Sequence, residues 1–313
     1  MSSLHHSVTK AFGVPGVIRE KGYYKTIDGA KIIYKTTDGR DQILARHQIT
    51  EHCIKTGYPW MDRYHLSKGG QPYVFAEGEY YVMTDRIPYR EADFSNPHEF
   101  LKIVDALANW HRCARRVAFT GSLYKGHPPA SLTETFYSQG NMMDSIRKRI
   151  RKQSKWSDFD VMFLKNYLHY RERMQRALQL LESTGYLNHC HKARQKGHIC
   201  HGDLKGDCLR IYGDRVYITK LGQAFVDYQL SDLCDIIRRR EKGQQDLKHS
   251  LILDTYSQVL PLEPEEEVIL EAILLYPAAF VKTATEYYQK KRTWTPAAIT
   301  NKMREILSDE GIT

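Results

Sequence analysis

The stretch of sequence that decides the fold is His201-Gly202-Asp203-Leu204-Lys205-Gly206-Asp207-Cys208, followed by Ile218-Thr219-Lys220-Leu221-Gly222. A short apolar strand leads into the first run, and a β-hairpin separates the two runs. This order brings a loop carboxylate and the second hairpin strand to one cleft. It is the layout of a phosphoryl-transfer site, where a carboxylate accepts the proton of the attacking hydroxyl and Asn and Asp oxygens hold Mg²⁺. Asp203 is therefore predicted to be the catalytic carboxylate, vestigial if the metal site is lost.

The two positions that should bind the metal carry unsuitable atoms. Cys208 stands five residues after Asp203, where Asn is expected, and Lys220 stands where the second strand should present Asp. Mg²⁺ takes hard oxygen ligands at about 2 Å, a thiol is soft, and an ammonium cannot coordinate a cation. We therefore predict no metal ligands here. These residues still allow ATP to bind without Mg²⁺, because the ammonium of Lys220 could neutralise the charge of a phosphate group. Asp207 is the one neighbouring carboxylate that could supply a replacement ligand.

The chain changes character near residue 87. Strands and one helix are predicted before it, and helices dominate after Asn96. We expect an α+β fold with two lobes. Residues 1–87 form a small β-rich lobe with one helix, and residues 88–313 form a larger, mainly helical lobe that carries the catalytic-loop-like segment 198–222. The basic segment 140–156 has few apolar residues and is predicted to be a mobile excursion.

Composition narrows the class of protein. The 313 residues are 42% hydrophobic and 27% charged, as in a globular protein. No apolar run near the roughly 20 residues of a membrane span was found, and no secretory leader. Six cysteines without a spacing pattern indicate a reduced compartment. We expect cytoplasmic synthesis without a signal peptide and no membrane span.

The net charge of +9 is concentrated in short basic runs at 147–152, 238–240 and 290–292. Such runs are usually solvated helix faces, although they also attract anionic partners. No nucleic-acid motif accompanies them, so nucleic acid is not the expected partner. A basic module for nucleic acid or acidic coat partners stays open as an alternative, and it predicts binding that weakens with salt.

Potential zinc ligands crowd together just before the loop. His189, Cys190 and His191 are followed by His198, Cys200 and His201. Zinc accepts nitrogen and sulfur, but the C-x-x-C spacing of a structural site is absent. A polar loop before a buried strand is the favoured interpretation.

These motifs resemble the aminoglycoside phosphotransferase and choline kinase group of the protein-kinase-like superfamily, and within it the CotS-type spore coat proteins. The loop of that family reads His-Gly-Asp, four residues and Asn, where this chain has HGDLKGDC. The family's metal-binding strand reads roughly Ile-Asp-Phe-Asp, where this chain has Thr219-Lys220-Leu221-Gly222. Residues 79–87, 108–111 and 286–288 are also similar in pattern. The resemblance implies a bilobal protein-kinase-like fold.

The resemblance also implies a set of site residues. Lys35 corresponds to the strand lysine that pairs with phosphate, and Glu51 is the helix carboxylate expected to orient it; a solvated lysine and an exposed helix acid are the alternatives. The hinge that meets adenine falls on Thr84 to Arg86, and Asp232 is expected to brace the loop. The implied nucleotide-binding residues are Lys35, Glu51, Thr84, Asp85, Arg86 and Lys220, and the structural residues are His201 and Asp232.

The departures at Cys208 and Lys220 decide the expected function. We expect a spore coat-associated pseudokinase that acts in binding or coat assembly, with other spore coat proteins as partners and a nucleotide or small molecule as a further ligand. The alternative is an active ATP-dependent phosphotransferase for small hydroxyl compounds, with a metal site rearranged around Asp207. The spore coat is the location that the resemblance implies.

Overall fold

The computed structural model describes residues 3–14, 19–20, 23–120, 123, 131–240, 247–289 and 295–309. Within them the chain divides into two units. Unit 1 is Met1–Pro128 with His191–Pro261, and unit 2 is Pro129–Cys190 with Leu262–Thr313. The predicted lobe of residues 1–87 and the segment 198–222 both belong to unit 1, and the boundary at residue 87 stays a prediction.

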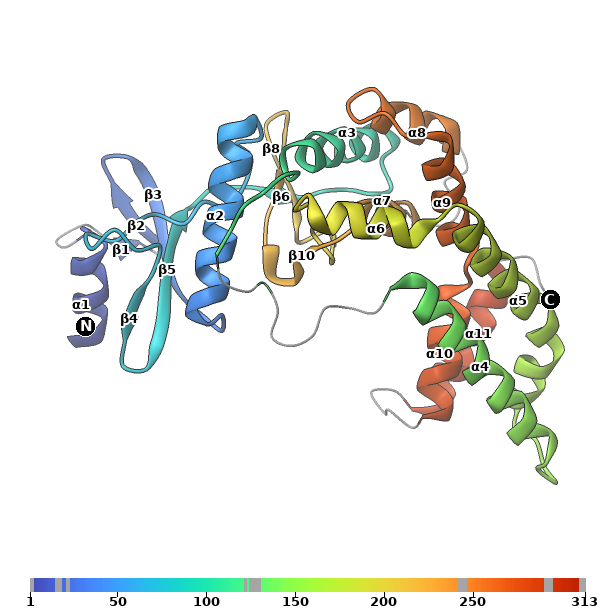
Figure 1. Cartoon of the computed structure of the whole chain (residues 1–313). Helices are drawn as coiled ribbons and strands as arrows, with labels where there is room; N and C mark the ends of the chain where they lie inside the picture. The colour runs from blue at the N-terminus through green and yellow to red at the C-terminus, as the bar shows by residue number, and fades with distance from the viewer. Residues whose placement is uncertain are drawn as a thin grey trace. The chain divides into compact units, whose positions relative to one another are not determined.

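The N-terminal part of unit 1 is a five-stranded sheet whose neighbouring strands pair antiparallel (Figure 1). Its hairpin turn lies at Ile27 and Asp28, because Thr26 pairs with Gly29. Gly29 has a φ of 102°, which suits glycine. In sheet order the strands are β1 (Arg19–Glu20), β2 (Tyr23–Thr26), β3 (Gly29–Thr36), β5 (Glu79–Asp85) and β4 (Val74–Ala76).

The predicted lobe of residues 1–87 contains two helices, whereas the sequence analysis expected one. α2 (Arg40–Thr56) is the expected helix, and it ends at Gly57 in the left-handed conformation. α1 (Ser3–Ala11) was missed because it is short and its packing partners lie far along the chain. It packs an apolar stripe against Met83 of β5, and Ile33 of β3 lies against the same cluster.

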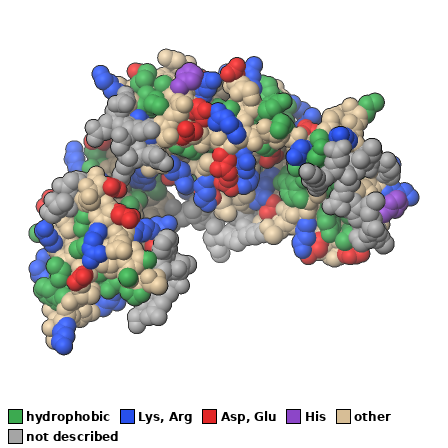
Figure 2. Space-filling view, turned by 180° about the vertical axis from the view of Figure 1, so that it is seen from behind, with side chains coloured by type: hydrophobic (Ala, Val, Ile, Leu, Met, Phe, Trp, Pro, Cys, Tyr) green, Lys and Arg blue, Asp and Glu red, His purple; other side chains and the backbone are tan. Residues whose placement is uncertain are grey.

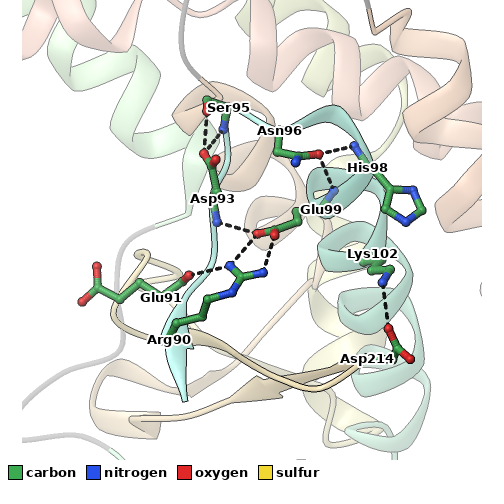
Figure 3. Close-up of polar contacts among 9 residues, drawn as sticks. All are labelled: Arg90, Glu91, Asp93, Ser95, Asn96, His98, Glu99, Lys102 and Asp214. Atoms are coloured by element: carbon green, nitrogen blue, oxygen red, sulfur yellow. Dashed lines mark hydrogen bonds and ion pairs between the residues drawn. The ribbon is translucent and has the colours of Figure 1, made fainter. Parts of the chain in front are cut away.

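The rest of unit 1 surrounds the loop with short strands and helices. β6, β8 and β9 form a three-stranded sheet, and β7 pairs with β10. Asn96 caps α3 by accepting hydrogen bonds from the backbone N–H groups of His98 and Glu99, and Glu99 binds Arg90 of β6 (Figure 3). The elements are β6 (Arg90–Glu91), α3 (Pro97–Cys113), β7 (Ile199–Cys200), β8 (Leu209–Tyr212), β9 (Arg215–Ile218), the 3₁₀ turn η1 (Leu221–Gln223), β10 (Phe225–Val226), α7 (Leu230–Arg239) and α8 (His249–Ser257). The helix α6 (Tyr186–Gln195) begins in unit 2 and ends in unit 1.

Unit 2 consists of helices around an aromatic core. Phe163 stacks on Phe280 with ring centroids 5.6 Å apart, and Tyr170 stacks on the same ring at 3.9 Å. The predicted mobile excursion at 140–156 is wrong up to Arg151, because Met143, Ile146 and Ile150 bury one face of α4. The helices are α4 (Leu132–Arg151), α5 (Asp158–Ser183), α9 (Pro264–Leu275), α10 (Ala278–Tyr288) and α11 (Pro296–Asp309).

One stretch of unit 2 is long and apolar enough to cross a membrane by length and composition alone. It runs over Pro264–Tyr288 and comprises α9 and α10 with Tyr276 and Pro277 between them. Of its most apolar window, 56% is buried. Core helices of soluble proteins give the same pattern, so this stretch is weak support for a membrane span.

Candidate functional site

The loop that begins at His201 is held by one buried carboxylate. Asp232, at the start of α7, accepts hydrogen bonds from the backbone N–H groups of His201 (2.6 Å) and Gly202 (3.0 Å), and it contacts Nε2 of His111 at 3.2 Å. Burial by itself would raise the pKa of Asp232, but the hydrogen bond and charge of His111 and the loop N–H groups lower it below its ordinary value. The loop conformation therefore depends on an ionised, fully buried side chain.

His201 and Gly202 fix the two sides of this loop. Nε2 of His201 lies 2.8 Å from the carbonyl oxygen of Thr219, which ties the loop to the end of β9. Gly202 has a φ of 79°, and a Cβ there would come within 2.5 Å of the carbonyl oxygen of Gln223. Glycine is required at this position because the backbone of the following turn leaves no room for a side chain.

Asp203 faces two cations. Its carboxylate lies 2.5 Å from Nζ of Lys205 and 3.5 Å from the guanidinium of Arg239. Its side chain is 28% exposed, so a ligand can still reach it. The predicted catalytic carboxylate is thus accessible, and its charge is balanced from within the protein.

Lys220 pairs with Asp207 and not with Asp203. The residue has a left-handed backbone with a φ of 57°, and its ammonium forms an ion pair with the Asp207 carboxylate. The hydrogen bond from Lys220 lowers the pKa of Asp207 below its ordinary value. Sγ of Cys208 lies 3.6 Å from the same carboxylate. The carboxylate that could have replaced a lost ligand is therefore already bound to a fixed positive charge.

These residues do not fit Mg²⁺. The position offers one paired carboxylate, Asp207, beside a thiol and an ammonium, whereas Mg²⁺ requires several hard oxygen ligands. Within the described ranges, no three His, Cys, Asp or Glu side chains form a group that could hold a metal ion. The histidines and cysteines considered as zinc ligands before the loop lie within these ranges and do not form such a group.

The predicted pair of Lys35 and Glu51 is not formed. Lys35 binds Glu79 of the neighbouring strand at 2.7 Å, and its side chain is 53% exposed. Glu51 makes a two-point contact with Arg63 at 2.6 and 2.7 Å. Side chains alternate along a strand, so Lys35 shares the sheet face of Ile33, which lies against α1. The nucleotide roles given to Lys35 and Glu51 rest on a register that this geometry does not support.

Tyr34 is the β3 residue that faces α2. It lines a pocket of about 60 Å³ together with Arg46 of α2 and Lys220. Its hydroxyl is hydrogen-bonded to that of Tyr64. Binding sites for drug-sized ligands are usually about 300–1,000 Å³, so this pocket is too small for a nucleotide and suits a few water molecules.

Arg46 is the α2 cation that lines the pocket with Tyr34 and Lys220. It is 92% buried, it forms an ion pair with Asp38, and it donates a hydrogen bond to the carbonyl oxygen of Gly222 at 3.0 Å. Burial lowers the pKa of this guanidinium. The helix thus contributes a cation that binds the backbone just after Lys220.

The predicted hinge carries its own contacts. Thr84 is buried, and Asp85 binds both Lys31 and Nε2 of His65, the latter at 2.9 Å. The backbone N–H of Arg86 donates to the carbonyl oxygen of Ala30 at 2.8 Å, and its guanidinium lies 4.2 Å from the centre of the Tyr23 ring. The Arg86 N–H is therefore already used within the sheet and is not free for adenine.

The family of the chain follows from its sequence as a whole. A family model described as "Spore coat putative kinase YutH" matches residues 17–312. The chain belongs to this family. A search of curated protein sequences finds no match.

Solved structures show the same fold in this spore coat kinase family member. An aminoglycoside phosphotransferase from Alicyclobacillus acidocaldarius matches with a TM-score of 0.81 and 14% identity, over 98% of this chain and 92% of that one. Spectinomycin phosphotransferase APH(9)-Ia, solved with ADP and spectinomycin, matches with a TM-score of 0.56 and 12% identity, over 96% and 94%. The GDP complex of aminoglycoside 2′-phosphotransferase-IIIa matches with a TM-score of 0.55 and 11% identity, over 99% of this chain and 100% of that one. The protein-kinase-like α+β fold is confirmed.

Sequence reasoning missed the residues that line the pocket beside Lys220. For Tyr34 a signal was available, since strict alternation along β3 puts Tyr34 and Lys35 on opposite faces. For Arg46, Asp62 and Tyr64 no signal existed, because only the packing of α2 and the segment after it brings them to Lys220. The pocket beside Lys220 in this spore coat kinase family member is therefore lined by tyrosine, arginine and lysine side chains that come from separate segments.

Proposed function

We propose that this member of the spore coat kinase family is a pseudokinase, which does not transfer phosphate from ATP·Mg²⁺ and acts by binding partners in the spore coat. The ion pair between Lys220 and Asp207 carries the proposal. It puts a positive charge at the position of a metal ligand and engages the neighbouring carboxylate. Two positive charges about 4 Å apart repel by roughly 4 kcal/mol even at an effective dielectric of 20, so Lys220 opposes a divalent cation.

Three further features support the proposal. Tyr34 takes the strand position that faces α2, Arg46 lies on α2, and the pocket that they line holds about 60 Å³. Phosphoryl transfer depends on a lysine–glutamate pair and metal ions to neutralise the developing charge. A site that lacks both the lysine–glutamate pair and the metal ions retains only the Asp203 carboxylate of the catalytic groups.

Nucleotide binding without metal is a narrower part of the proposal. Two of the three phosphotransferases named above were solved with ADP and with GDP. In this chain, Lys220 would have to leave Asp207 to meet a phosphate group, so we expect any metal-free binding of ATP to be weak. Spore coat proteins are the partners that we propose.

The decisive experiment restores the missing oxygen ligands. Isothermal titration with ATP, with and without Mg²⁺, and a γ-phosphate transfer assay over a panel of hydroxyl compounds should show no metal-dependent signal for the natural chain. The double variant Cys208→Asn/Lys220→Asp should gain Mg²⁺-dependent binding of ATP. Lys196→Asp, an exposed change of the same charge, should not. Robust metal-dependent turnover by the natural chain that is abolished by Asp203→Asn would refute the proposal.

A second candidate function is an active phosphotransferase for small hydroxyl compounds. The accessible Asp203, together with Asp207, whose side chain is 42% exposed, favours it. It predicts that Asp207→Asn removes turnover while the fold is retained. If turnover is found and Asp207→Asn leaves it unchanged, this candidate is excluded.

A further inference from the structure

Unit 2 contains a cavity of about 510 Å³ that the proposed function does not use. It lies between the connection from α4 to α5, the end of α10 and the start of α11. All of its lining residues belong to unit 2, whereas Asp203 and Lys220 belong to unit 1. The lining residues that matter here are Arg149, Lys155, Ser157, Asp160, Tyr287 and Tyr288.

The wall of this cavity is held by aromatic packing and hydrogen bonds. Tyr287 stacks on Phe159 with ring centroids 3.9 Å apart and ring planes 3° from parallel. Tyr288 donates its hydroxyl to Asp160 at 2.6 Å, and the other Asp160 oxygen accepts from the N–H and hydroxyl of Ser157 at 2.8 and 2.7 Å. Both Asp160 oxygens therefore accept hydrogen bonds from neutral donors, which fix the carboxylate within the wall and engage its acceptor sites.

The second acid in the lining is also paired. Oε2 of Glu286 lies 3.6 Å from Nζ of Lys302 on α11. Glu286 is thus ion-paired with Lys302, although this oxygen is buried and accepts no hydrogen bond from the described residues, whereas Asp160 is held by hydrogen bonds alone.

The cations at the cavity have no such partners. The Arg149 guanidinium lies 4.9 Å from the centre of the Tyr288 ring, and Lys155 is exposed. Neither makes an ion pair with any described residue, nor do Arg151 and Lys152 beside them. Trp156 is 52% exposed on the same connection, and its indole N–H donates to the carbonyl oxygen of Ile150 at 3.0 Å. The cavity therefore combines two cations that make no ion pair with a described residue with aromatic surface.

A larger cavity in unit 1 is lined by both cations and acids. It measures about 750 Å³, and its lysine, Lys102, lies 3.4 Å from Asp214, as Figure 3 shows. Its arginine, Arg215, lies 4.9 Å from the Trp60 ring, beside the same Asp214 in sequence. No excess of unpaired cations marks that cavity among the described residues, so charge gives it no preference for an anion.

We propose that the cavity of unit 2 binds an acidic peptide segment of a partner protein. Carboxylate side chains would meet Arg149 and Lys155 at the cavity, and the backbone would pass the exposed ring of Trp156. Interfaces of this kind rely on Arg, Tyr and Trp as anchors. The proposal does not depend on whether Asp203 supports phosphoryl transfer.

The distribution of charge favours a peptide over nucleic acid. A nucleic-acid surface needs a continuous basic stripe that follows the phosphates. On the face drawn in Figure 2, Lys and Arg side chains are interspersed with Asp and Glu side chains. A concave, aromatic-walled cavity of about 510 Å³ suits a few side chains better than a duplex.

The test compares two double variants with the same loss of charge. A fluorescein-labelled oligoglutamate is titrated with the full chain, and its anisotropy is followed at low and at physiological salt. Arg149→Ala/Lys155→Ala should weaken binding about ten-fold, whereas Lys165→Ala/Arg176→Ala, which removes two exposed cations of α5 away from the cavity, should change it less than about two-fold. Lys155→Glu provides a variant that should fold normally, because the side chain of Lys155 makes no hydrogen bond or ion pair with any described side chain. Weaker binding by this variant therefore cannot be attributed to misfolding.

Three results would overturn the proposal. Equal weakening by both double variants would mean attraction by net charge alone. Inorganic phosphate that binds as tightly as oligoglutamate through the same two cations would identify a small-anion site. A single-stranded oligonucleotide of equal charge that binds more tightly than oligoglutamate, with the same dependence on Arg149 and Lys155, would identify a nucleic-acid site.

Discussion

The loop site of unit 1 and the cavity of unit 2 differ in how their charges are balanced. At the loop, Lys220 binds Asp207, Lys205 binds Asp203, and Arg46 binds Asp38, so each of these cations has an acid of its own. At the cavity, Arg149 and Lys155 have no acidic partner among the described residues. An anion gains most where positive charge is unpaired, so the cavity is the better anion site although the loop has the family motif.

The two sites are also held together by different forces. The loop depends on buried polar groups around Asp232, where the loss of one partner leaves others unsatisfied. The cavity wall depends on stacked rings, where the loss of one ring leaves a void. Stability measurements on matched variants can therefore separate the two regions.

The largest effect is expected in the aromatic core of unit 2. Phe163 is fully buried between Phe280 and Tyr167. Phe163→Ala should lower the free energy of unfolding by about 4 kcal/mol, because it removes the ring and leaves a cavity. Urea unfolding followed by far-UV circular dichroism would measure it. Leu168→Ala, at a side chain that is 60% exposed, should cost under about 0.5 kcal/mol. Similar losses in both variants would contradict the proposed basis of the unit 2 core.

A slightly smaller effect is expected at the brace of the loop. Asp232→Asn keeps the shape of the side chain but removes the charge and one acceptor that serve His201, Gly202 and His111. We expect a loss of about 3 kcal/mol in the free energy of unfolding. Asp214→Asn, at a side chain that is 95% exposed, is the matched control and should be neutral. If Asp232→Asn left the free energy of unfolding unchanged, the loop would not need this carboxylate.

The pH dependence of unit 1 provides a third comparison. Burial, with smaller contributions from Arg115 and Lys196, lowers the pKa of His198 from its ordinary 6.5 to about 4. Between these values the unfolded chain binds a proton that the folded chain does not, so stability is complete above about pH 6.5 and declines as the pH falls toward 4. His198→Gln should make this decline shallower in urea unfolding at a series of pH values. If the pH profile of the variant were unchanged, His198 would not contribute to the loss of stability at low pH.

The smallest effect is expected at the ion pair between Lys220 and Asp207. The side chains of Lys220 and Asp207 are 50% and 42% exposed, so solvent screens their attraction. Lys220→Met should change the free energy of unfolding by less than about 1 kcal/mol. Lys102→Met, which removes the exposed contact with Asp214, is a matched control and should behave similarly. A loss of several kcal/mol in Lys220→Met alone would make this ion pair a structural element of the fold.

Much of the fold could be predicted from local sequence, and the site only in part. The strands around residues 23–36 and 79–85, the capped start of α3 at Asn96 and the His-Gly-Asp loop follow from patterns within a few residues. α1 and the helical course of α4 to Arg151 could not be predicted, because their stability comes from packing on distant residues. The site roles drawn from the family for Thr84, Asp85 and Arg86 stay predictions, although their described contacts lie within the sheet.

The sequence by itself determined that this chain has a His201-Gly202-Asp203 loop and that Cys208 and Lys220 stand where the family resemblance predicts metal ligands, because both statements depend only on the order of residues along the chain. Only the tertiary structure decided that Tyr34 and not Lys35 faces α2, and that Lys220 pairs with Asp207. The physical reason is that the face of a strand that becomes buried, and the acid that a cation meets, depend on packing between segments far apart in the chain.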